Sequence, residues 1–164
     1  MTNFKNILVT GGCGCIGSAL VNTLHRSGFN VTLFDLPEQI IRSQGVIDPN
    51  IKKIPGSILD ESSLSSALDG IEVVVHLAGF LGVKNTEENL YRCYEINVKG
   101  TENVLNACVR KRVNKFLFAS SSEVYGEPLE NPIEETTPTQ GKSFYAITKM
   151  MGEGLCRSFS QENS

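Results

Sequence analysis

The sequence has no long apolar run and no excess of basic charge. None of its hydrophobic runs approaches the roughly 18 residues that a membrane-spanning helix requires. The formal net charge is −3, so the chain lacks the basic surface with which proteins bind nucleic acid phosphates. The N-terminal residues MTNFKNILVT lead directly into a strand-like pattern, without the regions of a secretory signal. We therefore expect no membrane and no nucleic acid among the partners.

The cysteines are few and wrongly spaced for a metal site. There are five, an odd number, and no C-x-x-C pair or mixed His/Cys cluster occurs. Cys13 and Cys15 flank Gly14 in a loop, where small side chains are favoured for steric reasons. We expect no bound metal and a reduced, cytoplasmic protein, since disulfides are rare in that compartment.

The sequence does contain apolar strand-like segments that alternate with helical patterns along its whole length. Strands are expected at residues 5–10, 30–35, 51–56, 72–78 and 115–120, and helices at about 14–28, 60–70, 86–111 and 143–160. Strands this apolar, alternating with helices, predict an α/β fold whose parallel sheet is covered by helices on both faces. Residues 127–142 are expected to form one long surface loop, and loops of that length are often functional.

Three of the helical patterns carry expectations about single residues. In the first, Ile16, Leu20 and Leu24 recur at a spacing of four. Asp60 is expected to cap the second helix. The pattern at 86–111 predicts one long helix, whose inward face comprises Leu90, Tyr94, Val104, Leu105, Cys108 and Val109.

The segment TGGCGCIGS, residues 10–18, lies where the first strand gives way to the first helix. Its Gly11, Gly14 and Gly17 permit a tight turn and the close approach of a pyrophosphate, whose charge the helix N-terminus meets. A Walker-type loop is excluded, because Ser18 follows Gly17 with no lysine between them. Glycines also occur in ordinary turns, so it is the position between a strand and an amphipathic helix that favours a dinucleotide.

An acidic residue ends the second strand. Asp35 lies 18 residues beyond Gly17, where a carboxylate accepts hydrogen bonds from a ribose 2′-hydroxyl and repels a 2′-phosphate. No arginine follows it directly. We therefore predict NAD rather than NADP as the cofactor; the alternative is a solvated acid at a strand end.

The segment SFYAITKM places Tyr145 and Lys149 one turn apart on one helical face. Upstream, the serines at 120–122 and Glu123 follow the last strand, at the edge where parallel sheets bind ligands. A neutral tyrosine is a poor base at pH 7, and an ammonium group within about 4–6 Å lowers its pKa. The pair is compatible with a catalytic tyrosine and equally with a surface helix that follows ordinary turn residues, and it does not decide between them by itself.

Together these features resemble a known family. The motifs TGGCGCIGS, Asp35, VVHLAG (74–79), INVKGTENVLNAC (96–108), SSSEVYGEP (120–128) and YAITK (145–149) recur in the order and spacing of the extended short-chain dehydrogenases/reductases, in their nucleotide-sugar epimerase/dehydratase branch. The chain resembles the N-terminal, cofactor-binding part of that family over essentially all of its length.

The resemblance implies a Rossmann-like, doubly wound parallel sheet that forms one NAD-binding domain over residues 1–164, without the family's C-terminal substrate part. The chain is then a fragment or a naturally short relative. The implied activity is that of an NAD-dependent nucleotide-sugar 4-epimerase, in which hydride passes from a nucleotide-diphosphate sugar to NAD through a 4-keto intermediate. A decarboxylase or 4,6-dehydratase, a non-catalytic NAD-binding module and a structural dimerising module remain alternatives. A homodimer through the last two long helices is also implied.

Site residues follow by position. Tyr145 would be the catalytic base or acid, Lys149 would lower its pKa and bind the nicotinamide ribose, and Ser121 would hydrogen-bond the same substrate oxygen. Glu123 is either catalytic or structural. The residues expected to contact NAD are Gly11, Gly14, Cys15, Ile16, Gly17, Asp35, Ser57, Ile58, Leu77, Ala78, Gly79, Asn97, Tyr145 and Lys149.

Three positions depart from the family pattern or from a catalytic reading. Ser57 stands where the family often has an aspartate for the adenine, which leaves that contact open. The string Ser121, Ser122, Glu123 lacks the acid of the dehydratases and is similar to that of decarboxylases and some epimerases. His76 is expected to be a packed strand residue.

Overall fold

The computed structural model of the chain describes residues 4–127 and 131–162. Its sheet has five parallel strands in the order β3-β2-β1-β4-β5. The strands are β1 (Asn6–Thr10), β2 (Asn30–Asp35), β3 (Lys52–Pro55), β4 (Val73–His76) and β5 (Lys115–Phe118). This is the Rossmann strand order, so the predicted α/β fold with a parallel sheet is confirmed. Each strand lies within two residues of its predicted bounds.

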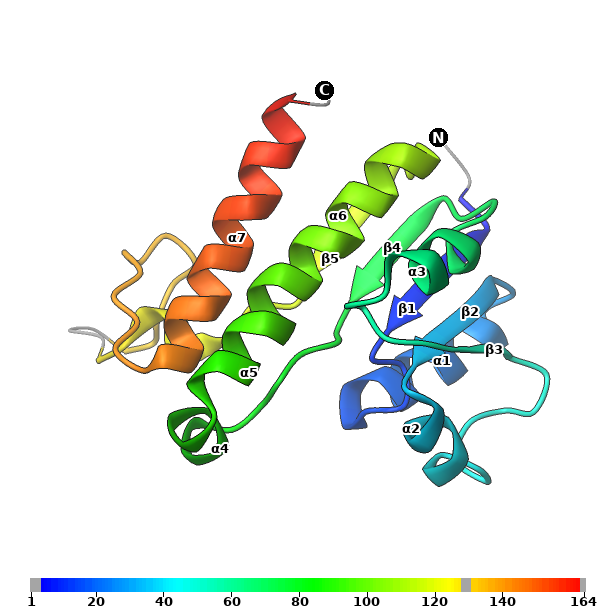
Figure 1. The fold of residues 1–164 in the computed structure, drawn as a ribbon, viewed down its shortest axis with the longest axis horizontal. Coiled ribbons are helices and arrows are strands. Elements are labelled where there is room, and N and C mark those ends of the chain that lie inside the picture. Colours follow the sequence, from blue (N-terminus) through cyan, green and yellow to red (C-terminus); the bar gives the residue numbers. More distant parts are fainter. Residues whose placement is uncertain (1–3, 128–130, 163–164) are drawn as a thin grey trace. The chain divides into compact units, whose positions relative to one another are not determined.

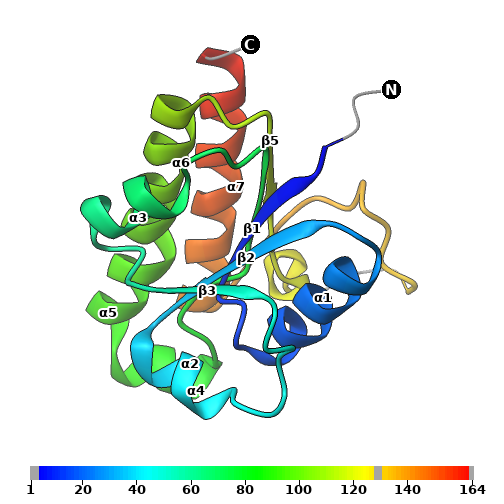
Figure 2. The same ribbon diagram turned by 90° about the vertical axis from the view of Figure 1, so that its right-hand side faces the viewer.

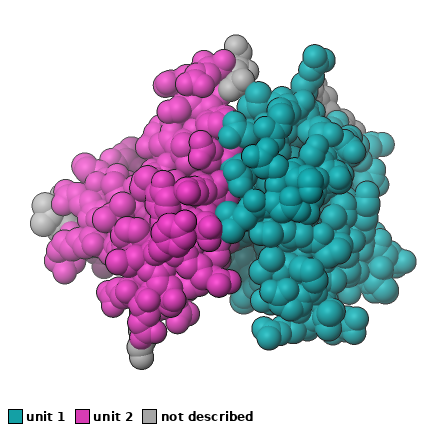
Figure 3. Space-filling view, in the orientation of Figure 1, with its two compact units in different colours: residues 1–78, 103–119 teal, residues 79–102, 120–164 magenta. Residues whose placement is uncertain are grey.

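The chain divides into two compact units (Figure 3). Unit 1 consists of Met1–Ala78 and Asn103–Ala119, and it holds the whole sheet. Unit 2 consists of Gly79–Glu102 and Ser120–Ser164. Among the described residues, no helix is long and apolar enough to cross a membrane.

Unit 1 covers its sheet on both faces. Its helices are α1 (Cys15–Arg26), α2 (Pro37–Arg42), α3 (Glu61–Ala67) and most of α6 (Gly100–Lys111). In Figure 2 the strands lie between α1 on one side and α3 and α6 on the other. The central strands are apolar because both of their faces are buried, as for Leu8, Leu33 and Val74, which have no exposed surface.

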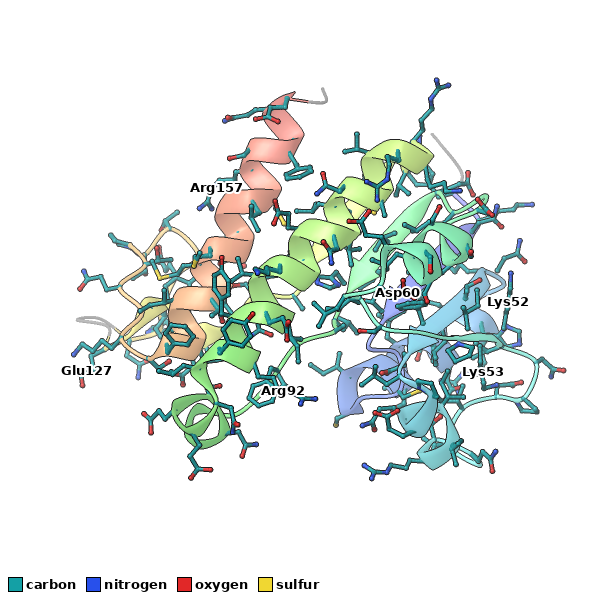
Figure 4. The ribbon with its side chains drawn as sticks, viewed as in Figure 1. Lys52, Lys53, Asp60, Arg92, Glu127 and Arg157 are labelled. Atoms are coloured by element: carbon teal, nitrogen blue, oxygen red, sulfur yellow. The ribbon has the colours of Figure 1, made fainter. Side chains whose placement is uncertain are left out.

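Two local predictions for unit 1 have different outcomes. Asp60, which Figure 4 labels, caps α3, since its side chain accepts a hydrogen bond from the Ser62 N–H. By contrast, Ile16 is 71% exposed, and the buried residues of α1 are Gly17 and Val21. Helix α2 was not predicted. It has no buried residue, whereas the sequence signal for a helix is the periodic recurrence of buried apolar residues.

Unit 2 is made of helices and loops. It contains α4 (Val83–Glu88), α5 (Leu90–Tyr94), the π-helical turn η1 (Glu95–Lys99), the short 3₁₀ turn η2 (Ser122–Tyr125) and α7 (Phe144–Glu162), together with the first residues of α6 (Figure 1). Helix α7 agrees with the helix predicted at 143–160. The segment between Gly126 and α7 has no helix or strand in its described part, and the backbone of Gln140 bonds back to Val124 (N–O 2.8 Å).

The prediction of a single helix over 86–111 is wrong. Helix α4 ends at Glu88, because the backbone of Asn89 (φ −138°, ψ 51°) is not helical, and a π-helical turn separates α5 from α6. A break in a helix and a π turn both change the angle at which residues before them project relative to those after them. A single helical periodicity therefore does not describe which residues of 86–111 are buried. Val104, Leu105 and Cys108 are buried as predicted, Tyr94 is half-buried, and Leu90 and Val109 are exposed.

Candidate functional site

The glycine loop of unit 1 is packed so closely that it has no room for side chains at two positions. Gly11 has a positive φ of 68°, and a Cβ there would lie 2.6 Å from the backbone N of Ala78. A Cβ at Gly17 would collide with the Gly11 carbonyl oxygen and lie 2.7 Å from the Gly12 Cα. Gly14 precedes α1 and donates its N–H to the Gly11 carbonyl at 3.1 Å. This loop leads into the positive end of α1, the geometry that a pyrophosphate requires.

Asp35 is held against that loop. One of its carboxylate oxygens accepts a hydrogen bond from the Cys13 N–H at 2.9 Å, and the other accepts from the Leu36 N–H at 2.8 Å. A carboxylate oxygen accepts more than one hydrogen bond, so both oxygens retain capacity for ribose hydroxyls. The two exposed residues of the first turn of α1, Cys15 and Ile16, border the same loop. The residues present therefore fit the adenosine and pyrophosphate parts of NAD.

The other predicted contacts in unit 1 lie just beyond strand ends. Ser57 follows β3, and its hydroxyl accepts a hydrogen bond from the Leu59 N–H at 3.2 Å. Ile58 is buried, and its carbonyl accepts from the Asn103 side chain at 3.1 Å. Sequence reasoning missed Asn103, because its partner lies 45 residues away and no local pattern marks the pair.

Beyond β4, the predicted NAD contacts Leu77 and Ala78 both hydrogen-bond to Thr10 through their backbone N–H groups. The Leu77 N–H bonds to the Thr10 carbonyl (3.1 Å), and the Ala78 N–H to its hydroxyl (3.4 Å). His76 is buried, and its Nδ1 lies 2.6 Å from the Thr10 hydroxyl, with the rings of Phe116 and Phe118 against it. The interpretation of His76 as a packed strand residue agrees with this environment.

Unit 2 brings the predicted serine, tyrosine and lysine together. Tyr145 and Lys149 lie one turn apart on α7, and both are buried, the lysine being only 4% exposed. The Lys149 Nζ lies 5.9 Å from the centroid of the Tyr145 ring. Ser121 caps the short turn η2, and its hydroxyl is near enough to Tyr145 to lower the tyrosine pKa. Glu123 is exposed, and its N–H donates to the Ser121 hydroxyl at 3.2 Å.

The electrostatics of this cluster differ from the sequence-based expectation. Burial raises the pKa of Tyr145 above its ordinary value of 10.0, and the nearby Cys93 and Glu123 raise it further, whereas the hydrogen bond with Ser121 lowers it. Burial also lowers the pKa of Lys149. The net shift of the tyrosine is therefore upward, because burial outweighs the favourable contacts that phenolate makes within the chain.

Asn97 and Gly79 lie in the same cluster. Asn97 is 2% exposed, and its side chain bonds both backbone groups of Phe80, accepting at 2.6 Å and donating at 3.1 Å. A Cβ at Gly79 would lie 3.2 Å from the Asn97 side-chain oxygen and 3.6 Å from the Lys149 Nζ. Of the predicted positions of unit 2, Asn97, Tyr145 and Lys149 are thus buried, Gly79 and Ser121 are half-buried, and Glu123 is exposed.

Two further members of that group were missed by the sequence analysis. Thr148 is fully buried, and its hydroxyl contacts Asn97 and the backbone of Tyr145. Cys93 is also fully buried, with its sulfur 3.3 Å from the Asn97 side-chain nitrogen. A signal for Thr148 was present, since a polar residue three positions after Tyr145 shares its helical face. Within the described part of the chain, no three His, Cys, Asp or Glu residues are placed to hold a metal ion.

Comparison with known proteins gives a consistent result. Residues 7–164 match the model of the NAD dependent epimerase/dehydratase family. The chain is 37% identical to a UDP-N-acetyl-alpha-D-glucosaminuronate decarboxylase of Bacillus cytotoxicus, over 95% of the chain and 50% of that protein. It is 35% identical to a UDP-glucose 4-epimerase of Erwinia amylovora, over 96% of the chain and 49% of that protein. The chain thus spans about half the length of these curated relatives.

Solved structures agree with this result. A UDP-glucose 4-epimerase of Brucella ovis in complex with NAD superposes with a TM-score of 0.89 at 28% identity, over 97% of this chain and 49% of that one. The NAD complex of the Thermus thermophilus UDP-glucose 4-epimerase gives a TM-score of 0.88 at 30% identity, over 96% of this chain and 51% of that one.

Proposed function

The chain belongs to the NAD-dependent epimerase/dehydratase family, and we propose that it carries the cofactor-binding and proton-transfer residues of a nucleotide-sugar 4-epimerase. NAD, which the sequence predicts as the cofactor, is the cofactor of this family. The observation that carries the proposal is the buried pair in which the Lys149 ammonium lies 5.9 Å from the centroid of the Tyr145 ring, with the half-buried Ser121 near the tyrosine. Lys149 would also serve NAD binding alone, but a protein that only binds NAD has no need of a serine hydroxyl beside a buried tyrosine.

Each unit holds its own set of the residues that we propose as cofactor contacts. In unit 1 the loop from Gly11 to Gly17 and the N-terminus of α1 would hold the pyrophosphate, and Asp35 would accept hydrogen bonds from the adenosine ribose. In unit 2 the Lys149 ammonium would donate to the hydroxyls of the nicotinamide ribose. When bound, NAD supplies an acceptor for the hydride that leaves the sugar carbon.

The protein's own part in the reaction is to move one proton. As the C4–H bond of the sugar breaks, the C4 hydroxyl must lose its proton, and the Tyr145 oxygen is the group placed to take it. Because burial raises the tyrosine pKa, phenolate needs the hydrogen bond from Ser121 and the positive charge of Lys149 beside it. After the keto sugar has rotated, hydride would return to the opposite face of C4 while Tyr145 returns the proton to the oxygen, which gives the inverted alcohol.

A second candidate function is a nucleotide-sugar decarboxylase. It is favoured by the string Ser121, Ser122, Glu123, in which Glu123 lies next to the Ser121 hydroxyl. It is also favoured by the 37% identity to the Bacillus cytotoxicus decarboxylase. A 4,6-dehydratase is less well supported, because Ser122 stands where that reaction needs an acid.

Product analysis separates these functions. The chain is incubated with NAD and either UDP-glucose or UDP-glucuronic acid, and the products are identified by chromatography and by release of carbon dioxide. An epimerase converts the glucose form to its 4-epimer, whereas a decarboxylase releases carbon dioxide from the glucuronic acid form. Tyr145→Phe should lower either turnover by about 100-fold or more while leaving NAD affinity largely unchanged. Turnover by this variant at the wild-type rate would rule out the role of Tyr145. NAD binding without any product would support a non-catalytic module instead.

A homodimer through the long helices is part of the same proposal. Ile147 and Met151, one turn apart on α7, are each 42% exposed, and so is Val109 on α6. Apolar side chains in these positions are typical of helices that pack against a second copy. Analytical ultracentrifugation of the 17.9 kDa chain would test this, since a monomer at micromolar concentration contradicts it.

A further inference from the structure

We propose that Thr148 is a positioning residue, whose buried hydroxyl fixes the turn of α7 that carries Tyr145 and Lys149. The inference rests on the proposed function, in which those two residues are the reacting pair. Thr148 directly precedes Lys149 and follows Tyr145 by three positions. It has no exposed surface, and it makes three polar contacts within unit 2.

The directions of these contacts follow from counting hydrogens. The Thr148 hydroxyl donates its single hydrogen to the Tyr145 carbonyl, with an O–O distance of 2.7 Å. It accepts a hydrogen bond from the Asn97 side-chain nitrogen at 3.1 Å. The sulfur of Cys93 lies 3.7 Å from the same oxygen, and because the threonine hydrogen is already used, the thiol must be the donor. One oxygen therefore joins α5, η1 and α7.

Asn97 extends this network to the backbone that follows β4. Its side-chain oxygen accepts from the Phe80 N–H at 2.6 Å, and its nitrogen donates to the Phe80 carbonyl at 3.1 Å. The same nitrogen approaches the Cys93 sulfur at 3.3 Å. Its two hydrogens thus serve three acceptors, one of which is Thr148, so the amide cannot shift without losing a bond. Asn97 lies in a π-helical turn, a feature often found at functional sites.

The reacting side chains lie beside this network. The Lys149 Nζ is 3.6 Å from the position of a Cβ on Gly79, the residue before Phe80. Tyr145 also lies near Ser121, whose hydroxyl lowers the tyrosine pKa. Replacing the Thr148 hydroxyl by a methyl group places an apolar carbon against the Asn97 amide. We therefore expect the turn of α7 that carries Tyr145 and Lys149 to move away from Asn97. A displaced Tyr145 moves away from the Ser121 hydroxyl, which lowers its pKa, so the tyrosine pKa rises further.

The alternative is that the hydroxyl only stabilises the fold, and unit 2 offers a matched control for this. Thr86 on α4 is as buried as Thr148, at 1% exposed. Within the part of the chain that the structure describes, its hydroxyl has no hydrogen-bond partner. Thr86→Val therefore removes the same atoms from the same unit without breaking a hydrogen bond, whereas Thr148→Val removes atoms that make three polar contacts.

The test is a pH titration of the chain labelled with ¹³C at tyrosine Cζ, followed by NMR. There are four tyrosines, and Tyr145→Phe assigns the signal of Tyr145. We expect Thr148→Val to raise the pKa of Tyr145 by about half a pH unit or more. Thr148→Ser retains the hydroxyl and should titrate as the wild type does, as should Thr86→Val. Thr148→Ala serves in place of the valine variant if that variant does not fold, with the same expected rise.

Two outcomes distinguish this inference from the proposed function. If Thr148→Val melts at a lower temperature but its Tyr145 titrates as in the wild type, the hydroxyl is structural and the inference is overturned. If the tyrosine pKa rises as expected but the wild-type chain binds no NAD in calorimetry, the proposed function fails and the positioning of Tyr145 by Thr148 stands. The titration itself needs neither cofactor nor turnover.

Discussion

The two units build their candidate sites from different parts of the polypeptide. In unit 1, backbone atoms shape the site: a Cβ on Gly11 or Gly17 would meet only other backbone atoms. In unit 2, buried side chains shape it, with the hydroxyl of Thr148 bonded to Asn97 and to the backbone of Tyr145. The first kind of site is sensitive to any added side chain. The second is sensitive to the loss of single polar atoms, even when shape and volume are preserved.

Gly17→Ala should have the largest effect. Its Cβ would meet the backbone of Gly11 and Gly12, which cannot move without distorting the loop, so we expect stability to fall by about 2–3 kcal/mol. NAD binding should be lost with it. Thermal unfolding and calorimetry measure the two effects.

Gly154→Ala is the matched control in unit 2. A Cβ on this residue of α7 would have no atom within 4 Å, so the substitution should stabilise the chain by about 0.5–1 kcal/mol through helix propensity. Equal effects at Gly17 and Gly154 would contradict the distinction between a site made of backbone and one made of side chains.

Buried titratable groups in the two units should respond to pH with opposite signs. In unit 1, burial raises the pKa of Cys108 from 9.0 to about 12. Above pH 9 the unfolded chain loses this proton first, so the stability due to Cys108 is complete below that pH and is lost as pH rises towards 12. The loss is about 2 kcal/mol at pH 10.5. Urea unfolding of the wild type and of Cys108→Ala, below pH 9 and at pH 10.5, measures this loss. A difference in stability between the two proteins that is the same at both pH values would contradict the assignment.

In unit 2, burial lowers the pKa of Lys149 below its ordinary value of 10.5. Between the lowered and the ordinary value the unfolded chain holds a proton that the folded chain does not, so stability rises with pH through that window. Lys149→Met should therefore lose this rise. The free energies of unfolding of the variant and the wild type are compared by urea unfolding from pH 7 to pH 10. If both change with pH by the same amount, the folded chain stabilises the Lys149 ammonium as well as water does.

The smallest effect is expected at the surface. The Arg110–Glu61 ion pair of unit 1 joins nitrogen and oxygen at 3.3 Å, and its side chains are 52% and 67% exposed. Glu61→Gln should lower stability by no more than about 0.5 kcal/mol, because water and salt screen the pair. A loss as large as that of Gly17→Ala would show that surface charge, rather than the interior of the units, decides stability.

The sequence predicts those parts of each site whose residues lie close together along the chain. The strands and the Gly11–Gly17 loop follow from runs of adjacent residues, and Asp35 follows from its place at a strand end. Tyr145 and Lys149 share one helical turn, so their proximity was also predictable. The network around Thr148 was not, because its contact with Asn97 spans 51 residues.

The helix wrongly predicted over 86–111 illustrates the same limit. Its apolar spacing looked continuous, but the break at Asn89 and the π turn at 95–99 leave no mark in the hydrophobic pattern. That π turn contains Asn97, the residue that bonds to both Phe80 and Thr148. The part of unit 2 least visible in the sequence is therefore the part that orders its side-chain site.

The first measurement to make is a calorimetric titration of the chain with NAD and, separately, with NADP. We expect micromolar binding of NAD and binding of NADP at least about 10-fold weaker, because the Asp35 carboxylate would accept from a 2′-hydroxyl and repel a 2′-phosphate. Asp35→Asn should narrow that difference, since it removes the repelling charge. Binding of neither nucleotide, or equal binding of both, would contradict the assignment of the glycine loop and Asp35 as an NAD site.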